Sequence, residues 1–177
     1  SYLQTQGGDL DLEAINEPSE ISAAYLGRIS AAASAGGGDP GAGEIVFEDN
    51  CIDCHTLGGE DGEEAIMGPD LASIGTKGLK FLSDSILKPA KEITPGYETY
   101  EVVAEDGRKT IGIKTRDDGG EIDITKDTGE VVTISKAEIK EITIDELKSI
   151  MPDDLSEAMT VKDYQDILSY LMMQKAE

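Results

Sequence analysis

The chain of 177 residues is long enough for one domain of ordinary size, with room for an insertion and a tail. Its 37 acidic residues against 15 lysines and arginines give a formal net charge of −22, which excludes the basic surface typical of nucleic-acid binders. Hydrophobic residues make up 38 %, as in folded rather than disordered acidic proteins. The sequence shows neither an apolar run of about 18 residues nor a basic and apolar leader, so we expect a mature or excised chain.

The first 38 residues are predicted to form a tail outside the main domain. Between residues 19 and 33, Ile21, Tyr25 and Ile29 recur at the spacing of one helix face, which predicts a short amphipathic helix. The glycines at 36–38 end this helix and predict a flexible joint. The tail could be a tether, a partner-binding arm or a helix folded back on the domain.

A short helix is predicted over residues 40–48, directly after this joint. Asp39 and Pro40 suit the N-cap and the first position of a helix. Gly43 and Phe47 are four residues apart and therefore share one face. We expect a second helix to approach closely at Gly43 and to pack against Phe47.

Both cysteines and the only histidine of the chain occur together, as Cys51-Ile52-Asp53-Cys54-His55. The spacing C-x-x-C-H is typical of a c-type haem attachment site. Two thiols three residues apart can add to the two vinyl groups of one porphyrin, and the adjacent imidazole can ligate its iron. The motif therefore predicts covalent haem binding.

Three other kinds of site use the same residue types. Structural zinc normally requires four Cys or His ligands, and this chain has three. A thioredoxin-like redox pair belongs at a helix N-terminus in a βαβ setting, whereas the residues before Cys51 are predicted to be helical. A disulfide across two residues would close too small a loop to add much stability. Covalent haem is the interpretation that best accounts for the motif.

A Gly-Pro pair comes after the motif at Gly68 and Pro69, in the run Gly68-Pro69-Asp70-Leu71. Gly-Pro is a common turn signal with little specificity. A backbone carbonyl beside the proximal imidazole would accept its Nδ1 proton, fix the tautomer and make the ring a more basic ligand. Pro69 is the candidate for this acceptor.

Residues 97–144 show the alternation of short antiparallel strands. Asp106-Gly107 is a strong hairpin signal, and Asp127-Thr128-Gly129 is a second turn. We predict an inserted subdomain here, either a small antiparallel sheet or an SH3-like barrel. The predicted strands are residues 97–105, 108–116, 121–126, 130–136 and 137–144.

A second axial ligand for a haem iron cannot be histidine, because the chain has one His. Its five methionines offer a soft thioether ligand instead. Met151 precedes Pro152, so we expect it in an irregular segment that could present a ligand, and it is the preferred candidate. Met67 and Met159 remain alternatives.

The chain closes with an amphipathic helix predicted over residues 160–174. Thr160 and Asp163 have the spacing of a capping box, with Asp in place of the usual Glu or Gln. Apolar residues recur behind them at helical spacing, at Tyr164, Ile167, Leu168, Leu171 and Met172.

The order of these motifs resembles that of a class I cytochrome c, and especially the haem-binding cytochrome domains of Planctomycetes and Verrucomicrobia. The likeness extends over residues 40–174 and includes the runs 82–89 (LSDSILKP) and 93–97 (ITPGY). It implies a mainly α fold, the class I cytochrome c helical fold, around one covalent haem c. Residues 39–96 and 145–177 would then form the cytochrome domain, and residues 97–144 a small β insertion before the Met-ligand loop.

The resemblance also implies the roles of individual residues. It makes Cys51 and Cys54 the thioether anchors, and it makes His55 and Met151 the two ligands of the haem iron. It makes Pro69 the acceptor of the imidazole proton.

One further expectation concerns the propionates of the haem, one of which we expect Tyr97 or Tyr100 to bind by a hydrogen bond. The implied function is single-electron transport between redox partners, such as a dehydrogenase, an oxidase or a respiratory complex, with no enzymatic reaction. The compartment would be bacterial periplasm or the extracellular space, because c-type haem is attached there. The alternatives are a five-coordinate haem that acts as a sensor or peroxidase, and a haem domain that serves an attached dehydrogenase.

Overall fold

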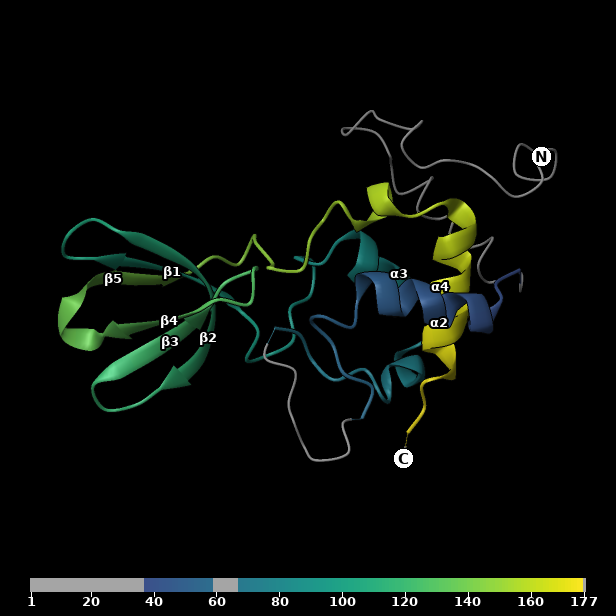
Figure 1. Cartoon of the computed structure of the whole chain (residues 1–177), viewed down its shortest axis with the longest axis horizontal. Helices are drawn as coiled ribbons and strands as arrows, with labels where there is room; N and C mark the ends of the chain where they lie inside the picture. The colour runs from purple at the N-terminus through teal and green to yellow at the C-terminus, as the bar shows by residue number, and fades with distance from the viewer. Residues whose placement is uncertain (1–36, 59–66, 177) are drawn as a thin grey trace. The chain divides into compact units, whose positions relative to one another are not determined.

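The computed structural model describes residues 37–58 and 67–176 (Figure 1). The tail helix predicted at residues 19–33 lies outside these ranges. Contacts group the described chain into two compact units. The first unit holds residues 37–53, 71–88 and 153–176, and the second holds residues 54–58, 67–70 and 89–152.

The first unit is helical. It contains α2 (Pro40–Asn50), α3 (Leu79–Leu87) and α4 (Val161–Met173), together with the short 3₁₀ helices η2 (Ile74–Lys77) and η4 (Leu155–Ala158). The predicted helices at residues 40–48 and 160–174 are confirmed, each within about two residues of its predicted ends. Within the described ranges, no helix is long and apolar enough to cross a membrane.

Capping explains where α2 and α4 begin. The Asp39 carboxylate accepts from the backbone N–H of Gly41 at 2.9 Å, and Pro40 occupies the first helical position. The predicted capping box of α4 is present in full, because Thr160 Oγ1 accepts from the N–H of Asp163 while the Asp163 carboxylate accepts from the N–H of Thr160.

The two capped helices cross at a glycine, as the sequence predicts. A Cβ added to Gly43 would lie 2.0 Å from the backbone O of Asp166, so only glycine allows this approach. Phe47, buried at 2 % exposure, packs against Tyr170 with the ring centroids 5.7 Å apart. The buried carboxylate of Asp166 also accepts from the N–H of Asp39 at 2.6 Å, which fixes the start of α2 against α4.

Helix α3 is joined to α4 by a buried polar contact. The Tyr164 hydroxyl is fully buried and donates to Ser83 Oγ at 2.9 Å. Burial raises the pKa of Tyr164 to about 12 because the phenolate would lose its hydration. Around this contact lies the core of the unit, which includes Phe47, Leu82, Ile86, Ile167, Leu168 and Leu171.

The second unit is built on a five-stranded antiparallel sheet. Its strands are β1 (Thr99–Ala104), β2 (Lys109–Asp117), β3 (Glu121–Thr125), β4 (Val131–Ser135) and β5 (Ile139–Ile144). The spatial order is β4-β3-β2-β1-β5, so β4 and β5 are the edge strands. These strands confirm the prediction of an antiparallel sheet made from the alternation and the turn signals.

The sheet is strongly curled. The chain passes from one edge, β4, to the other, β5, through the three-residue 3₁₀ helix η3 (Lys136–Glu138). Four residue steps reach at most about 14 Å, whereas the edges of a flat five-stranded sheet would lie about 19 Å apart. The edges must therefore turn toward each other, and the concave side encloses the cluster Val102, Ile122, Ile124 and Ile134.

The predicted mainly α fold class is wrong. Within the described ranges the structure has three α-helices of 11, 9 and 13 residues and five strands that pair into one sheet. The fold is therefore mixed α and β. The resemblance implies that the strands are a small insertion in a helical domain. In the structure they bury a hydrophobic cluster of their own and form most of a separate compact unit.

Candidate functional site

The C-x-x-C-H motif begins where α2 ends. Cys51 is the C-cap residue of the helix, and its backbone N–H donates to the carbonyl of Phe47 at 2.8 Å. Residues 51–54 then form a turn in which Cys51 and Cys54 are half-buried, while Ile52 and Asp53 between them are exposed. The two thiols are not joined in a disulfide. Helix α2 thus fixes the start of the motif, and the turn keeps both cysteines partly accessible.

The imidazole of His55 is held by the carbonyl of Pro69. Nδ1 lies 2.8 Å from Pro69 O, and the ring is half-buried. Since a carbonyl oxygen can only accept, Nδ1 is the donor and carries the proton. The lone pair of the neutral ring is then on Nε2, which is the nitrogen available to a metal.

Gly68 lies directly against the imidazole of His55. A Cβ added to Gly68 would lie 2.5 Å from Cε1 of His55 and 2.7 Å from Nδ1. Any larger residue would therefore displace the imidazole or the backbone that holds it. Gly68 and Pro69 act together, because the first leaves room for the ring and the second fixes its orientation.

Asp70 secures the same segment from its other side. Its carboxylate accepts from the Thr56 hydroxyl at 2.5 Å and from the N–H of Gly58 at 2.6 Å. These bonds connect the residues directly after the motif to the residue directly after Pro69. Asp70 is a residue whose role sequence reasoning missed, because its partners lie 12 and 14 residues earlier in the chain and no local pattern marks them.

The surroundings of His55 favour the neutral imidazole. Burial lowers the pKa of His55 because the charged ring would lose hydration. The hydrogen bond to Pro69 and the negative charge of Asp70 act in the opposite direction and only partly offset this effect. The net direction is downward, which keeps the Nε2 lone pair free of a proton at neutral pH.

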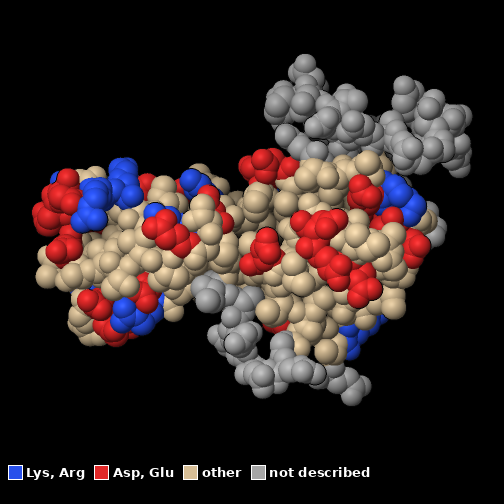
Figure 2. All heavy atoms as spheres, viewed as in Figure 1, with Lys and Arg blue, Asp and Glu red and all other residues tan. Residues whose placement is uncertain are grey.

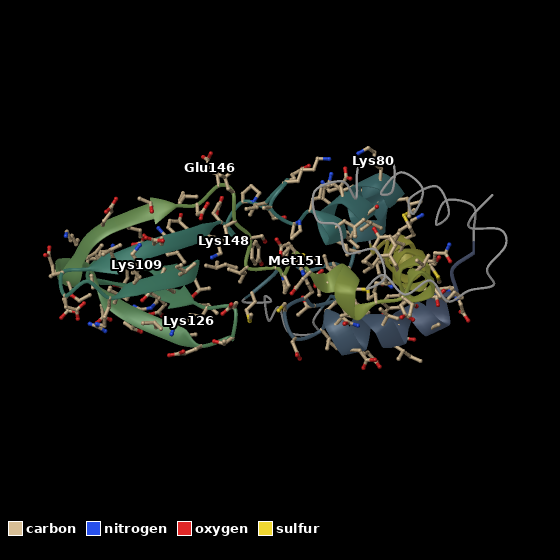
Figure 3. The ribbon with its side chains drawn as sticks, turned by 90° about the horizontal axis from the view of Figure 1, so that it is seen from above. Lys80, Lys109, Lys126, Glu146, Lys148 and Met151 are labelled. Carbon is tan, nitrogen blue, oxygen red and sulfur yellow. The ribbon has the colours of Figure 1, made fainter. Side chains whose placement is uncertain are left out.

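The methionine candidates lie in three different settings. Met151 is half-buried in the irregular segment after β5, where its N–H donates to Ser149 Oγ at 3.1 Å (Figure 3). The sulfur of Met67 lies 3.5 Å from the position of a Cβ on Gly129, in the β3–β4 turn. Met159 is 4 % exposed and belongs to the hydrophobic core. The irregular segment predicted around Met151 is confirmed.

Of the predicted site residues, the structure brings Pro69 against His55. Tyr97 lies in a turn in which its N–H donates to Thr94 O at 3.0 Å. Tyr100 is on β1, half-buried, with the Lys114 ammonium 5.0 Å from its ring centroid.

The donor set fits a covalently held haem. Two half-buried thiols, not joined in a disulfide, precede an imidazole whose Nδ1 is already engaged, so Nε2 is the ring nitrogen that could ligate a haem iron. Among the residues that the structure describes, no three His, Cys, Asp or Glu side chains are grouped to bind a metal ion by themselves. No model of a known protein family matches the chain, and neither does any curated protein.

Proposed function

We propose that this chain attaches one haem c covalently and carries single electrons between redox partner proteins, with no substrate reaction of its own. One observation carries the proposal: His55 comes directly after two cysteines at the C-x-x-C-H spacing, and Pro69 accepts its Nδ1 proton at 2.8 Å. A ring held in this way offers Nε2 as a ligand. When bound, the haem iron supplies a ferrous–ferric couple that accepts and returns one electron.

Each residue of the motif has a separate task in this proposal. Cys51 and Cys54 would hold the cofactor by thioether bonds, which prevents its loss on reduction or oxidation. His55 would ligate the iron from the proximal side. Pro69 would keep the imidazole in one tautomer and raise its basicity, as partners of metal-bound histidines do.

Met151 is the proposed distal ligand. A thioether sulfur stabilises ferrous iron relative to a second nitrogen ligand and so raises the reduction potential. With both axial positions filled by protein, small molecules would have no open site on the iron. This requirement separates an electron carrier from a sensor or a peroxidase, and it makes Met151 the residue to test.

The acidic surface of α2 favours a redox partner with a basic docking surface. Glu44, Glu48 and Asp49 are exposed on this helix, and Asp53 is exposed in the turn after it. Figure 2 shows acidic side chains gathered on this face. Opposite charge accelerates encounter between proteins. We propose a dehydrogenase, an oxidase or a respiratory complex as the partner, on the periplasmic or extracellular side of a bacterial membrane.

The proposal is tested by mass and optical spectra of the purified chain. We expect a haem that stays on the peptide containing residues 51–55 after acid extraction, and a weak far-red ferric band from a methionine–iron bond. The band should disappear in Met151→Ala. It should persist in Met173→Ala, a matched control because Met173 is 65 % exposed, and in Met67→Ala.

Two results would overturn the proposal. A chain that acquires no covalent haem when expressed with a haem-attachment system would refute it outright. If the haem is attached but the far-red band is absent and ferrous iron readily binds carbon monoxide, the distal position is open. The five-coordinate sensor or peroxidase would then replace the electron carrier.

A further inference from the structure

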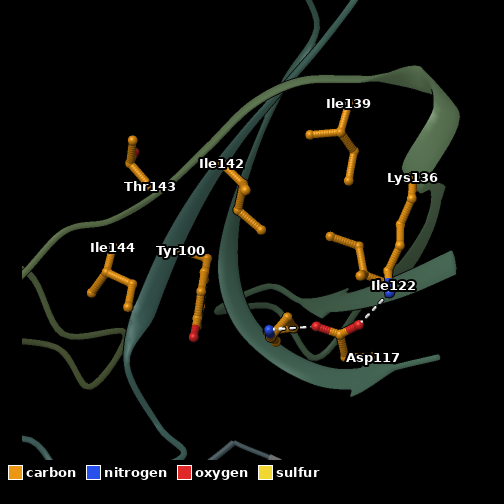
Figure 4. Close-up of a pocket in the computed structure, with 9 residues that line it drawn as sticks. Tyr100, Asp117, Ile122, Lys136, Ile139, Ile142, Thr143 and Ile144 are labelled. Atoms are coloured by element: carbon orange, nitrogen blue, oxygen red, sulfur yellow. Dashed lines mark hydrogen bonds and ion pairs between the residues drawn. The ribbon is translucent and has the colours of Figure 1, made fainter. Parts of the chain in front are cut away.

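The curled sheet contains a pocket whose lining includes Tyr100, one of the two propionate candidates, but none of Cys51, Cys54, His55, Pro69 and Met151. It has a volume of about 590 Å³, within the range of about 300–1,000 Å³ that is usual for small-molecule sites. Residues of β1, β2, β3, β5 and η3 line it, all of them in the second unit (Figure 4).

One wall of the pocket is apolar and open to solvent. In the register of the sheet, Ile144 lies opposite Tyr100 and Ile142 lies opposite Val102. Directly opposite residues share a face, so both isoleucines project to the same concave side as buried Val102. Ile142 and Ile144 are nevertheless 41 % and 49 % exposed, because β5 is an edge strand and nothing described covers them.

Beside this wall, the pocket lining carries charged side chains. The Asp117 carboxylate accepts from the ammonium groups of Lys114 and Lys136, each at 2.6 Å. Figure 4 shows both contacts meeting at Asp117. Two ammonium groups against one carboxylate leave the pocket lining with one positive charge, while the carboxylate of Glu98 acts on Lys114 from outside the lining.

Lys114 retains donors for a ligand. An ammonium has three N–H donors, and the hydrogen bond described for Lys114 uses one of them, toward Asp117. Its Nζ lies 5.0 Å from the ring centroid of Tyr100, so the charged group and the apolar wall are adjacent. A ligand on the wall would thus place an acidic end group next to this ammonium.

We propose that this pocket binds a small amphipathic carboxylate. The apolar body of the ligand lies along Tyr100, Ile142 and Ile144, and its carboxylate pairs with the ammonium of Lys114. Apolar burial supplies the attraction, while the charge selects an anion over a neutral or cationic molecule with the same body.

The test uses three probes that share an eight-carbon chain and differ in the end group: octanoate, 1-octanol and octylammonium. Each is titrated calorimetrically into the full-length chain at about 0.15 M salt, which screens the negative field of the chain beyond about 8 Å. We expect octanoate to bind about tenfold more tightly than 1-octanol, as one charge-assisted hydrogen bond provides. Octylammonium should bind more weakly than both.

Two substitutions on β2 then test whether the ammonium of Lys114 is the group that binds the carboxylate. Lys114→Gln should weaken octanoate binding about tenfold and leave 1-octanol binding unchanged. Lys109→Gln is the matched control. Lys109 is also on β2 and is also paired with a carboxylate, that of Glu101 at 2.7 Å, but it does not line the pocket. It should leave both affinities unchanged.

Isoleucine methyl NMR of the unaltered chain locates the ligand even if Lys114→Gln fails to fold. Octanoate should shift the methyl signals of Ile139, Ile142 and Ile144, and not those of Ile45 and Ile111. The proposal fails if octanoate does not bind, if 1-octanol binds equally well, if Lys109→Gln weakens binding as much as Lys114→Gln, or if the shifts lie elsewhere. None of these readouts depends on haem.

Discussion

At the scale of single residues, the imidazole of His55 is positioned by residues 68–70 rather than by the motif itself. The backbone carbonyl of Pro69 orients the ring, Gly68 leaves the space in which it lies, and Asp70 holds the segment with two hydrogen bonds. In the proposed haem site, the motif supplies the donor atoms, and residues 68–70 orient the imidazole.

Gly68→Ala should disturb the imidazole without removing any donor atom. The added methyl group would lie 2.5 Å from Cε1 of His55, so the ring or the backbone must move. We expect a loss of about 1–3 kcal/mol in the free energy of unfolding and, under the proposed function, a lower fraction of chains that acquire haem. Urea denaturation and the haem absorbance per protein measure the two effects.

Gly119→Ala is the control for that substitution. A Cβ at Gly119 meets no atom within 4 Å, so the change should leave both stability and haem content near those of the parent chain. Equal effects of the two substitutions would show that the contact between Gly68 and the ring has no special importance.

At the scale of elements, α2 and α4 form the frame from which the motif begins. They are capped by local side chains, joined by the buried carboxylate of Asp166, and brought together at Gly43. Cys51 is the residue that ends α2. Substitutions that shift α2 relative to α4 should therefore also displace Cys51, the first cysteine of the motif.

Gly43→Ala should separate these helices. Its Cβ would lie 2.0 Å from the backbone O of Asp166, and we expect a loss of stability of about 2 kcal/mol or more. Gly41→Ala in the same helix should be neutral or slightly stabilising, since its Cβ lies 3.4 Å from Asp39 Oδ1 and alanine favours helix. Thermal unfolding of the two variants provides the comparison, and equal melting temperatures would contradict the close approach.

Thr160→Ala should weaken the start of α4. The substitution removes the hydroxyl that accepts from the N–H of Asp163 and one half of the capping box, so we expect a loss of about 1 kcal/mol. Thr160→Ser keeps the hydroxyl and should retain most of the stability. If serine and alanine are equally destabilising, lost packing of the threonine methyl rather than capping explains the effect.

At the scale of the whole molecule, the charge of −22 coexists with a sheet in which several acidic residues, among them Glu101, Asp117 and Asp123, are paired with cations. Arg116 donates to the Asp123 carboxylate through Nε and Nη2 at 2.6 and 2.9 Å, and the Thr133 hydroxyl donates to it at 2.6 Å. These bonds lower the pKa of Asp123 to about 2, and the ammonium groups of Lys114 and Lys136 lower the pKa of Asp117 to about 2.

These pKa values predict how stability depends on pH. Because the folded pKa of Asp123 is below its ordinary value of 3.8, its ionised form stabilises the folded state above about pH 4. That contribution is lost as the pH falls toward 2. Asp123→Asn should therefore be less stable than the parent chain at neutral pH, and the difference should vanish near pH 2, as measured by urea denaturation across this range.

Asp127→Asn is the matched control for pH. Asp127 is exposed in the β3–β4 turn and makes no ion pair within the described ranges, so its substitution should change the free energy of unfolding little at any pH. If the difference in the free energy of unfolding between Asp123→Asn and the parent chain stays constant down to pH 2, the pKa of Asp123 is not lowered.

Local patterns predicted much of the fold because the forces that set its elements act over a few residues. Asp39 with Pro40, and Thr160 with Asp163, mark the helix starts, since capping joins a side chain to the backbone two or three positions on. The strands are predicted by alternation between turn signals such as Asp106-Gly107. The predicted fold class, mainly α, was wrong because the pattern of strands in the sequence does not reveal that the sheet buries a hydrophobic cluster of its own.

By itself, the sequence determined the donor atoms at Cys51, Cys54 and His55 and the order of helices and strands around them. Only the tertiary structure decided that Gly68 lies against the imidazole, that Asp70 secures it, and that the sheet curls to leave Ile142 and Ile144 beside Lys114. The physical reason is distance along the chain. Contacts between residues that are far apart in sequence depend on how whole elements pack, and no local periodicity or cap carries that information.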